Sequence, residues 1–300
     1  MQRPIISRQL SMLFLVPALI FIALFLLYPF ISIFQMSFTN QALVGANAVN
    51  PRFVGLDNYT ELFNPDRWMR RGELGHSLLL TAQFVIGSAL IGQAILGLSI
   101  AVAFHNRKGL LRETVFTLAI AAWIIPDVVV AFAWFAYLDP DGTLNKMLGL
   151  IGIEGPDWLF EYPMWSIIAF NTWRGTAFSM LLFSSALASI PPSYLETAEV
   201  IGASNWQKFK DILLPLLSAY ILTDLILITL WTFNTFGPFL LTGGGPIFKT
   251  DVISIYTYRV GLRFFEFGKG SAIAMIVMLI NLALASIYLT IARARQVRTT

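Results

Sequence analysis

Residues 196–215, ETAEVIGASNWQKFKDILLP, form a polar interruption between two long apolar segments. Two helix starts are predicted here. Ser193 with Glu196 three residues later fits one capping-box pattern, and Ser204 with Gln207 fits a second. In such a pattern the two side chains satisfy backbone N–H groups that the first helical turn leaves without a partner. The interruption therefore predicts two short helices rather than a disordered loop.

Gly202 separates the two predicted helices, and a residue that adopts positive φ ends a helix and turns the chain sharply. The second helix carries Trp206, Phe209 and Leu213 at spacing i, i+3, i+7, which gives it one apolar face. Pro215 suits the first turn of the helix that follows. The stretch thus predicts a helix-turn-helix with one apolar side, attached at both ends to apolar segments.

The composition of the chain excludes an ordinary soluble domain. Of its 300 residues, 57% are hydrophobic and only 12% are charged. The chain has no cysteine, which excludes disulfides and thiolate metal sites or nucleophiles. The excess of basic residues does not indicate a nucleic-acid partner, because these residues lie beside apolar segments, as membrane flanks do. We expect an all-α integral membrane protein in contact with lipid.

Apolar runs of about 20 residues, the length that spans a bilayer, recur along the chain. The first is too long for a signal peptide and ends without a small-residue cleavage site, so we interpret it as an uncleaved anchor. The organisation we predict is an N-terminal helix with an external loop (1–75), a transmembrane core (76–292) and a tail (293–300). Six spans are expected, at residues 10–38, 77–104, 114–138, 164–190, 217–241 and 271–292.

Loop charge predicts the orientation of the six spans. With both termini inside, the cytoplasmic segments hold ten lysines and arginines in 52 residues, against nine in 91 residues outside. The flanking residues Arg3, Arg8, Arg295 and Arg298 belong to the inner set. The higher inner density favours cytoplasmic termini.

The interruption also resembles the "EAA" loop of ABC-importer permeases. The residues that carry the resemblance are Glu196, Thr197, Ala198, Gly202, Ala203, Ile212, Leu214 and Pro215. In that family the loop is a cytoplasmic coupling helix that docks in a cleft of the ATPase subunit. Two departures are visible: Thr197 replaces the usual second alanine, and Ile201 occupies the position of a frequent aspartate, which puts an ion pair there in doubt. The alternative is an ordinary amphipathic interfacial helix. We call residues 193–213 the elbow.

Further fragments resemble permeases of carbohydrate importers of the MalF type. They are Val54–Tyr59, Gly142–Asn145, Thr242–Pro246, Tyr256 with Tyr258, and Gly268 with Ser271 and Ala272. The resemblance implies a type I importer permease fold in the bacterial inner membrane. It also implies three partners: a second, MalG-like permease, an ATPase dimer and an extracytoplasmic sugar-binding protein. The sugar is left open between a neutral oligosaccharide, a glycerophosphate-type compound and an acidic sugar.

No catalytic or metal site is predicted on this chain. Residues 243–250 come close to a P-loop, but Phe248 stands in place of the second glycine and no strand precedes them. If transport is ATP-driven, ATP and Mg therefore bind a partner ATPase. His76 and His105 lie at opposite ends of the second span, too far apart to share a metal.

Ionisable groups inside a span cost about 2.5–3.5 kcal/mol each and normally face a bundle interior or a cavity. Asp127, Arg174 and Asp224 are such groups. Sugars are held by aromatic faces together with amide and carboxylate hydrogen bonds. The candidate substrate path is accordingly Asp127, Trp173, Arg174, Trp231, Asn234, Phe236 and Phe239. Pairing of Asp127 with Arg174 and simple packing of the aromatic side chains are equally open.

The alternative function is an ion-coupled secondary transporter that works alone. Such carriers show internal repeats with broken helices and ion-binding residues at mid-membrane. No repeat is visible in this sequence, and six spans is short for a secondary transporter. We therefore favour a sugar-importer permease that switches between inward-open and outward-open states.

Overall fold

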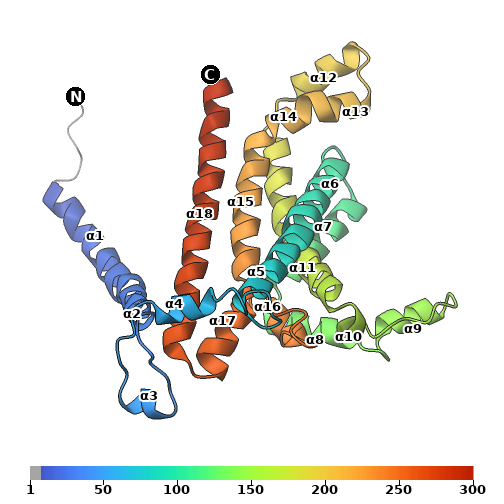
Figure 1. Cartoon of the computed structure of the whole chain (residues 1–300). Helices are drawn as coiled ribbons and strands as arrows, with labels where there is room; N and C mark the ends of the chain where they lie inside the picture. The colour runs from blue at the N-terminus through green and yellow to red at the C-terminus, as the bar shows by residue number, and fades with distance from the viewer. Residues whose placement is uncertain (1–7, 300) are drawn as a thin grey trace. The chain divides into compact units, whose positions relative to one another are not determined.

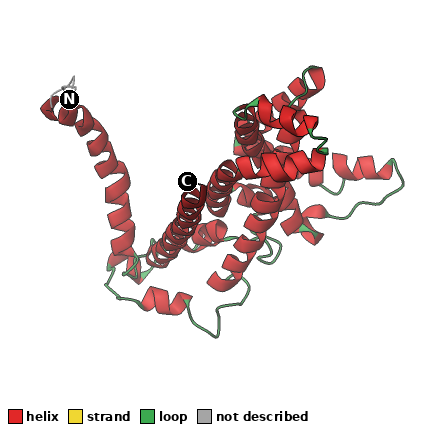
Figure 2. Cartoon of the chain, turned by 90° about the horizontal axis from the view of Figure 1, so that it is seen from above, coloured by secondary structure: helices red, strands yellow, loops and turns green. Residues whose placement is uncertain are grey.

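The computed structural model describes residues 8–299 of the chain, and the side chains of residues 12–294. Arg3 lies outside the described residues, as do the side chains of Arg8, Arg295 and Arg298. Every regular element in the described part is a helix (Figure 2), and this confirms the all-α prediction. The chain divides into two compact units, residues 1–65 with 257–279 and residues 66–256 with 280–300.

Long helices build the second unit. They are the continuous rod of α5 (Leu74–Phe84), η2 (Val85–Gln93) and α6 (Ala94–Phe104), then α7 (Leu110–Ile124), α11 (Pro163–Ala188), α15 (Ser218–Asn234) and the C-terminal part of α18 (Phe267–Thr299). Helix α11 is central, because it packs against the rod, α7 and α15. In lipid such packing depends on close contact and polar bonds between helices rather than on removal from water.

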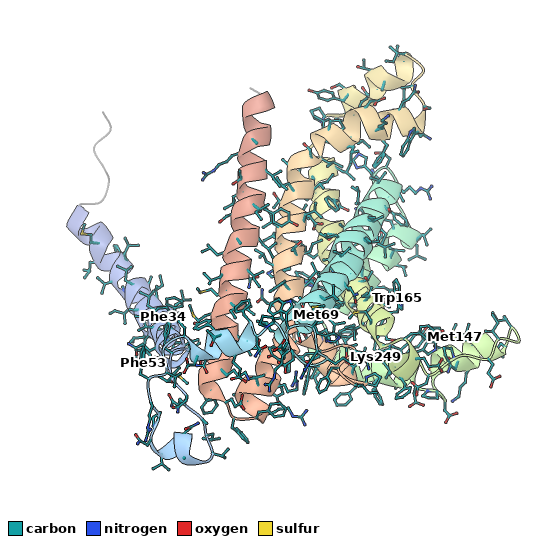
Figure 3. The ribbon with its side chains drawn as sticks, viewed as in Figure 1. Phe34, Phe53, Met69, Met147, Trp165 and Lys249 are labelled. Atoms are coloured by element: carbon teal, nitrogen blue, oxygen red, sulfur yellow. The ribbon has the colours of Figure 1, made fainter. Side chains whose placement is uncertain are left out.

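Shorter helices lie at the two ends of α11 and α15 (Figure 1). At one end are α12 (Pro192–Val200), α13 (Asn205–Gln207), η3 (Lys208–Leu213) and α14 (Leu214–Leu216). At the other end are α8 (Asp127–Leu138), α9 (Thr143–Gly149), α10 (Trp158–Glu161) and α16 (Gly237–Thr242). Figure 3 shows Met147 of α9 and Lys249, which follows α16, at this second end. The elbow and α16 are therefore separated by the length of the long helices.

A buried polar network joins the rod, α11 and α15. Asn171 donates its amide to Ser88 Oγ (2.9 Å) and to Thr232 Oγ1 (3.3 Å). Gln93 donates to the same Thr232 hydroxyl at 3.4 Å. All four side chains are buried, so these bonds satisfy groups that lipid would leave without partners. The network fixes how three membrane helices meet.

Within the described residues, three helices are long and apolar enough to cross a membrane, and up to six spans result if each bent helix pair is one span. The predicted third span, 114–138, is broken by a bend of 110° after Ile124. Pro126 explains this break, because the residue before a proline is forced out of the helical conformation. The predicted fifth span, 217–241, is also broken: α15 ends at Asn234 and Thr235 is extended. Here the ring of Pro238 would meet the carbonyl of Asn234 in a continuous helix.

The first unit fastens the segment after the first span to the start of α18. Its helices are α1 (Arg8–Ile22), η1 (Ala23–Leu27), α2 (Tyr28–Met36), α3 (Ala46–Val49), α4 (Asp57–Leu62), η4 (Arg259–Arg263) and the first part of α18. The division between the two units falls inside α17 (Ile253–Tyr258), after Tyr256. Phe34 and Phe53 lie near each other at the end of α2 (Figure 3). Both rings contact the ring of Phe38, which lies between them.

Backbone hydrogen bonds hold this junction together. Leu43 N donates to Phe265 O at 3.0 Å, and Gly268 N donates to Gln41 O at 2.8 Å. A side chain on Gly268 would collide with the carbonyl of Thr39, so the close approach requires glycine. The Lys269 ammonium pairs with Glu61 at 2.6 Å, across 208 residues of sequence. The first and last spans are thus joined at this point.

Candidate functional site

The turn of the elbow is closed by its own backbone. Gly202 has φ +77° and follows α12, as its sequence position predicted. Gly202 N donates to Glu199 O at 3.0 Å and Ala203 N donates to Ala198 O at 2.9 Å. These two bonds are those of a Schellman motif, which satisfies the last carbonyls of a helix. The turn is therefore determined locally.

The two predicted capping boxes had different outcomes. The Ser204–Gln207 box is present, with Gln207 N donating to Ser204 Oγ (3.3 Å) and Ser204 N donating to Gln207 Oε1 (2.7 Å). The Ser193–Glu196 box is wrong, because α12 begins at Pro192 and Pro191 is its N-cap without a side-chain bond. Proline at the first helical position needs no cap for its missing N–H, and the helix starts two residues earlier than the Ser193 cap predicts.

Beside the turn, a groove of about 420 Å³ opens on the elbow. Three residues of the EAA-like set line it, Thr197, Ala198 and Ile212, together with Ser193, Tyr194 and Ile201. The remaining members do not line the groove: Glu196 and Gly202 are exposed, and Ala203 is half-buried. The groove is mostly apolar in its lining residues.

Large apolar side chains of the elbow are unusually exposed. The exposed fraction is 88% for Val200, 77% for Ile201 and 68% for Trp206. One ion pair crosses the elbow, between Lys208 Nζ and Glu199 Oε1 at 2.9 Å. An apolar patch of this kind beside a groove marks a surface for another protein or for a membrane.

The C-terminal part of the EAA-like set lies in a continuous helical stretch. Ile212 is in η3, and Leu214 and Pro215 are in α14. Pro215 lies in the first turn of α14, as the sequence predicts, but α14 is short. The chain bends by 67° between residues 216 and 218, and α15 begins at Ser218.

At the opposite end of the second unit, Asp127 and Arg174 form an ion pair, one of the alternatives that the sequence left open. The neighbouring Trp173 lines a cavity of about 470 Å³ with Trp134 and Tyr137. The rings of Trp134 and Trp173 have centroids 5.8 Å apart. Three candidate residues are thus brought together beside an aromatic cavity that the sequence did not predict.

The candidates on α15 and α16 form a second group. Trp231 packs edge-on against Phe178, with centroids 4.7 Å apart, and Phe236 stacks on Phe239 at the same spacing. Asn234 makes two reciprocal amide hydrogen bonds with Asn281 of α18, of 3.1 and 3.0 Å. The sequence analysis missed Asn281. The signal was present, because Asn281 is the single polar residue in the apolar run 272–283.

Asp224 belongs to neither of these two sets of candidate residues. Asp224 is fully buried in α15, and within the described residues neither of its oxygens has a hydrogen-bond partner. The part of the chain that the structure describes holds no cluster of three or more histidine or carboxylate side chains placed to bind a metal ion. We therefore find two sets of features, an exposed apolar surface with a groove at the elbow and polar–aromatic positions near α8 and α16.

Comparison with known proteins finds relatives that match nearly the whole chain. The sulfoquinovosyl glycerol permease SmoG of Agrobacterium fabrum is 30% identical, covering 96% of this chain and 92% of that protein. The trehalose/maltose permease MalF of Thermococcus litoralis is 30% identical, covering 97% and 96%. A chain of a bacterial ABC transporter involved in the import of the acidic polysaccharide alginate superposes with a TM-score of 0.80 at 25% identity, covering 95% and 96%.

Residues 93–297 also match the family described as the inner membrane component of binding-protein-dependent transport systems. This match includes the elbow, α15, α16 and most of α18, so both sets of features lie inside it. The chain therefore belongs to the family of inner membrane permease components of binding-protein-dependent ABC transport systems.

Proposed function

We propose that this chain is the permease subunit of an ATP-driven importer that carries a sugar into the cell. One observation carries the proposal: relatives that match nearly the whole chain are permeases for sulfoquinovosyl glycerol and for trehalose and maltose. The alginate transporter with the same fold also imports a carbohydrate. These substrates differ in size and charge but share sugar hydroxyl groups.

The elbow is proposed as the surface that transmits ATP-driven movement. Its exposed Val200, Ile201 and Trp206 are costly in water, and a cleft in an ATPase subunit would cover them. The groove beside them would receive an apolar side chain of that subunit. In this proposal ATP and Mg bind the partner ATPase dimer, and this chain holds neither.

The proposed assembly contains four kinds of subunit: this chain, a second permease, the ATPase dimer and an extracytoplasmic sugar-binding protein. One neighbour supports the last partner, an alginate transporter solved with a pentasaccharide-bound periplasmic protein. The elbow and both termini face the cytoplasm in this arrangement, as the density of basic residues in the loops favours.

The sugar path is proposed to pass the polar–aromatic positions on α8, α11, α15 and α16. Asn234 has a carbonyl oxygen that can accept a further hydrogen bond, and the rings of Trp231 and Phe236 are partly exposed. Asp127, Trp173 and Arg174 form a second polar–aromatic position beside the cavity of about 470 Å³. Two positions of this kind along one subunit suit a chain of sugar units better than a single small ion.

A reconstituted importer tests this proposal. Proteoliposomes would hold all four subunit types with ATP inside, and the panel of labelled sugars would be maltose, trehalose, sulfoquinovosyl glycerol and an alginate pentasaccharide. We expect uptake of at least one sugar that requires both ATP and the binding protein. Uptake driven by a sodium or proton gradient through this chain without an ATPase would instead establish a secondary transporter.

A further inference from the structure

The contact between α15 and α18 contains a reciprocal amide pair. Asn234 Nδ2 donates to Asn281 Oδ1 at 3.1 Å, and Asn281 Nδ2 donates to Asn234 Oδ1 at 3.0 Å. Asn234 Nδ2 also donates to Leu230 O of its own helix at 2.7 Å. This last bond fixes the orientation of the Asn234 amide, and the pair then fixes that of Asn281.

Hydrogen-bond capacity remains after these three bonds are made. Both N–H groups of the Asn234 amide are used, but the Asn281 amide has given only one of its two. Each carbonyl oxygen has accepted one bond and has one lone pair left within the described part of the chain. The pair therefore presents one donor and two acceptors side by side.

The surroundings of the pair indicate what these groups face. Asn234 is exposed and Asn281 is half-buried in this chain, although both lie in membrane-spanning helices. Lipid offers no hydrogen bonds, so polar groups at this depth face protein or a water-filled passage. Trp231, one turn away on α15, is 52% exposed. The helix ends directly after Asn234, where a passage would interrupt it.

We propose that Asn281 is a specificity-determining residue that contacts the transported sugar, acting with Asn234 as one unit. The inference rests on the proposed function and adds to it the chemical group that is bound. One donor beside two acceptors matches two adjacent hydroxyls of a sugar ring. One hydroxyl donates to a carbonyl oxygen and accepts from Asn281 Nδ2, and the second donates to the other carbonyl oxygen. Trp231 then covers an apolar face of the ring.

The same two helices provide a matched control. The hydroxyls of Thr229 and Tyr288 share a hydrogen bond of 3.1 Å, also between α15 and α18. Tyr288→Phe removes that bond without touching the amide pair. The test compares Asn281→Leu with Tyr288→Phe in the complete reconstituted importer. The probe is the panel sugar that the wild-type importer takes up, and the readout is the number of sugars transported per ATP hydrolysed.

We expect Asn281→Leu to lower this ratio about tenfold, as loss of one or two neutral hydrogen bonds to the sugar implies. Tyr288→Phe should leave the ratio unchanged, because weaker helix packing reduces uptake and ATP hydrolysis together. Asn281→Ser, which keeps one donor and one acceptor, should give an intermediate ratio. This variant also carries the test if Asn281→Leu does not assemble with its partners.

Two failures are distinguishable. If the wild-type importer takes up no panel sugar, the proposed function itself is rejected. If the wild type transports and both Asn281 variants keep a ratio within about twofold of Tyr288→Phe, only the role of Asn281 is rejected, and the pair is then a packing contact.

Discussion

The elbow and the break after Asn234 are both interruptions of long helices, and they are built in opposite ways. At the elbow, residues within five positions of each other satisfy the backbone through the Schellman motif and the Ser204 capping box. At the break, the extended residue Thr235 depends on a distant side chain: Ser254 Oγ donates to Thr235 O at 2.7 Å. The elbow thus satisfies its freed backbone groups locally, whereas the break, which Pro238 imposes, satisfies the Thr235 carbonyl through a tertiary contact.

This difference follows from what surrounds each interruption. A loop in water can leave a backbone group to solvent, so its geometry depends only on its own caps. At the break the Thr235 carbonyl is part-buried and lipid offers it no donor, so a partner from the protein, Ser254, satisfies it. We expect substitutions at the elbow to affect coupling to a partner, and substitutions at the break to affect stability.

The largest expected contrast is in accessibility, because the proposed topology puts the two ends of α15 on opposite sides of the membrane. The chain has no cysteine, so Asn205→Cys at the elbow and Leu150→Cys beyond α9 introduce single thiols. An impermeant thiol reagent should label position 150 from outside intact cells, where the native side chain is 88% exposed, and should not label position 205. Permeabilised cells should show labelling at both positions. If the reagent labels position 205 but not position 150 in intact cells, the orientation of the chain in the membrane is the opposite of the proposed one.

The next effect is expected at Gly202. A Cβ atom added at Gly202 meets no neighbouring atom within 4 Å, so the main cost of a side chain there is the positive φ, roughly 1–2 kcal/mol. Gly202→Val should displace the elbow and lower the ATP hydrolysis stimulated by sugar-loaded binding protein about tenfold. The protein should still insert and assemble.

Gly202→Asn is the matched control, because asparagine tolerates positive φ. It should retain most of the stimulated activity. Normal stimulation in Gly202→Val would mean that the elbow does not transmit movement.

Ser254→Ala tests the tertiary hydrogen bond at the break after Asn234. It leaves the part-buried Thr235 carbonyl without its 2.7 Å partner, at a cost of about 1–3 kcal/mol. We expect a clear fall in the melting temperature of the purified importer. Thr223→Val is the control, since it removes an exposed hydrogen bond within α15, from the Thr223 hydroxyl to Ala219 O. Equal shifts for both variants would mean that the Ser254 contact adds no stability at the break.

The smallest effect is expected at Ser204. Ser204→Ala removes the helix cap, which costs about 1 kcal/mol at an exposed site because water replaces the bond. Amide hydrogen exchange should become faster at residues 205–208 and nowhere else. Ser204→Asp keeps a capping oxygen and should restore the slower exchange. If Ser204→Ala exchanges like the wild type, the cap contributes nothing to the elbow.

The same contrast explains which features the sequence predicted. Gly202 and the Ser204–Gln207 box were found because their partners lie within a few residues. The error at Ser193 came from a neighbour, Pro192, which starts the helix without a side-chain cap. Pro126 and Pro238 were visible in the sequence, but the predicted spans ran through both. The length of an apolar run indicates that a segment can span the membrane, but not whether its helix bends.

The polar contacts inside the membrane were the least predictable. Asn281 is 47 residues from Asn234, and nothing local to either residue indicates the pairing. The Asp127–Arg174 pair was foreseen only as one of two possibilities, because charge in a span implies a partner or a cavity and does not say which. Both assignments needed the helix packing.

The junction of the first and last spans also has a consequence for the time course of synthesis. Glu61 and Lys269 are 208 residues apart, and at about 5–20 residues per second the ribosome makes the second about 10–40 s after the first. During that interval the N–H of Leu43 and the carbonyl of Gln41 lack their partners at Phe265 and Gly268. The segment after the first span therefore lacks these contacts until the start of the last span has been synthesised. A chain that terminates before Phe265 would carry its first span in the membrane with this segment permanently unfastened.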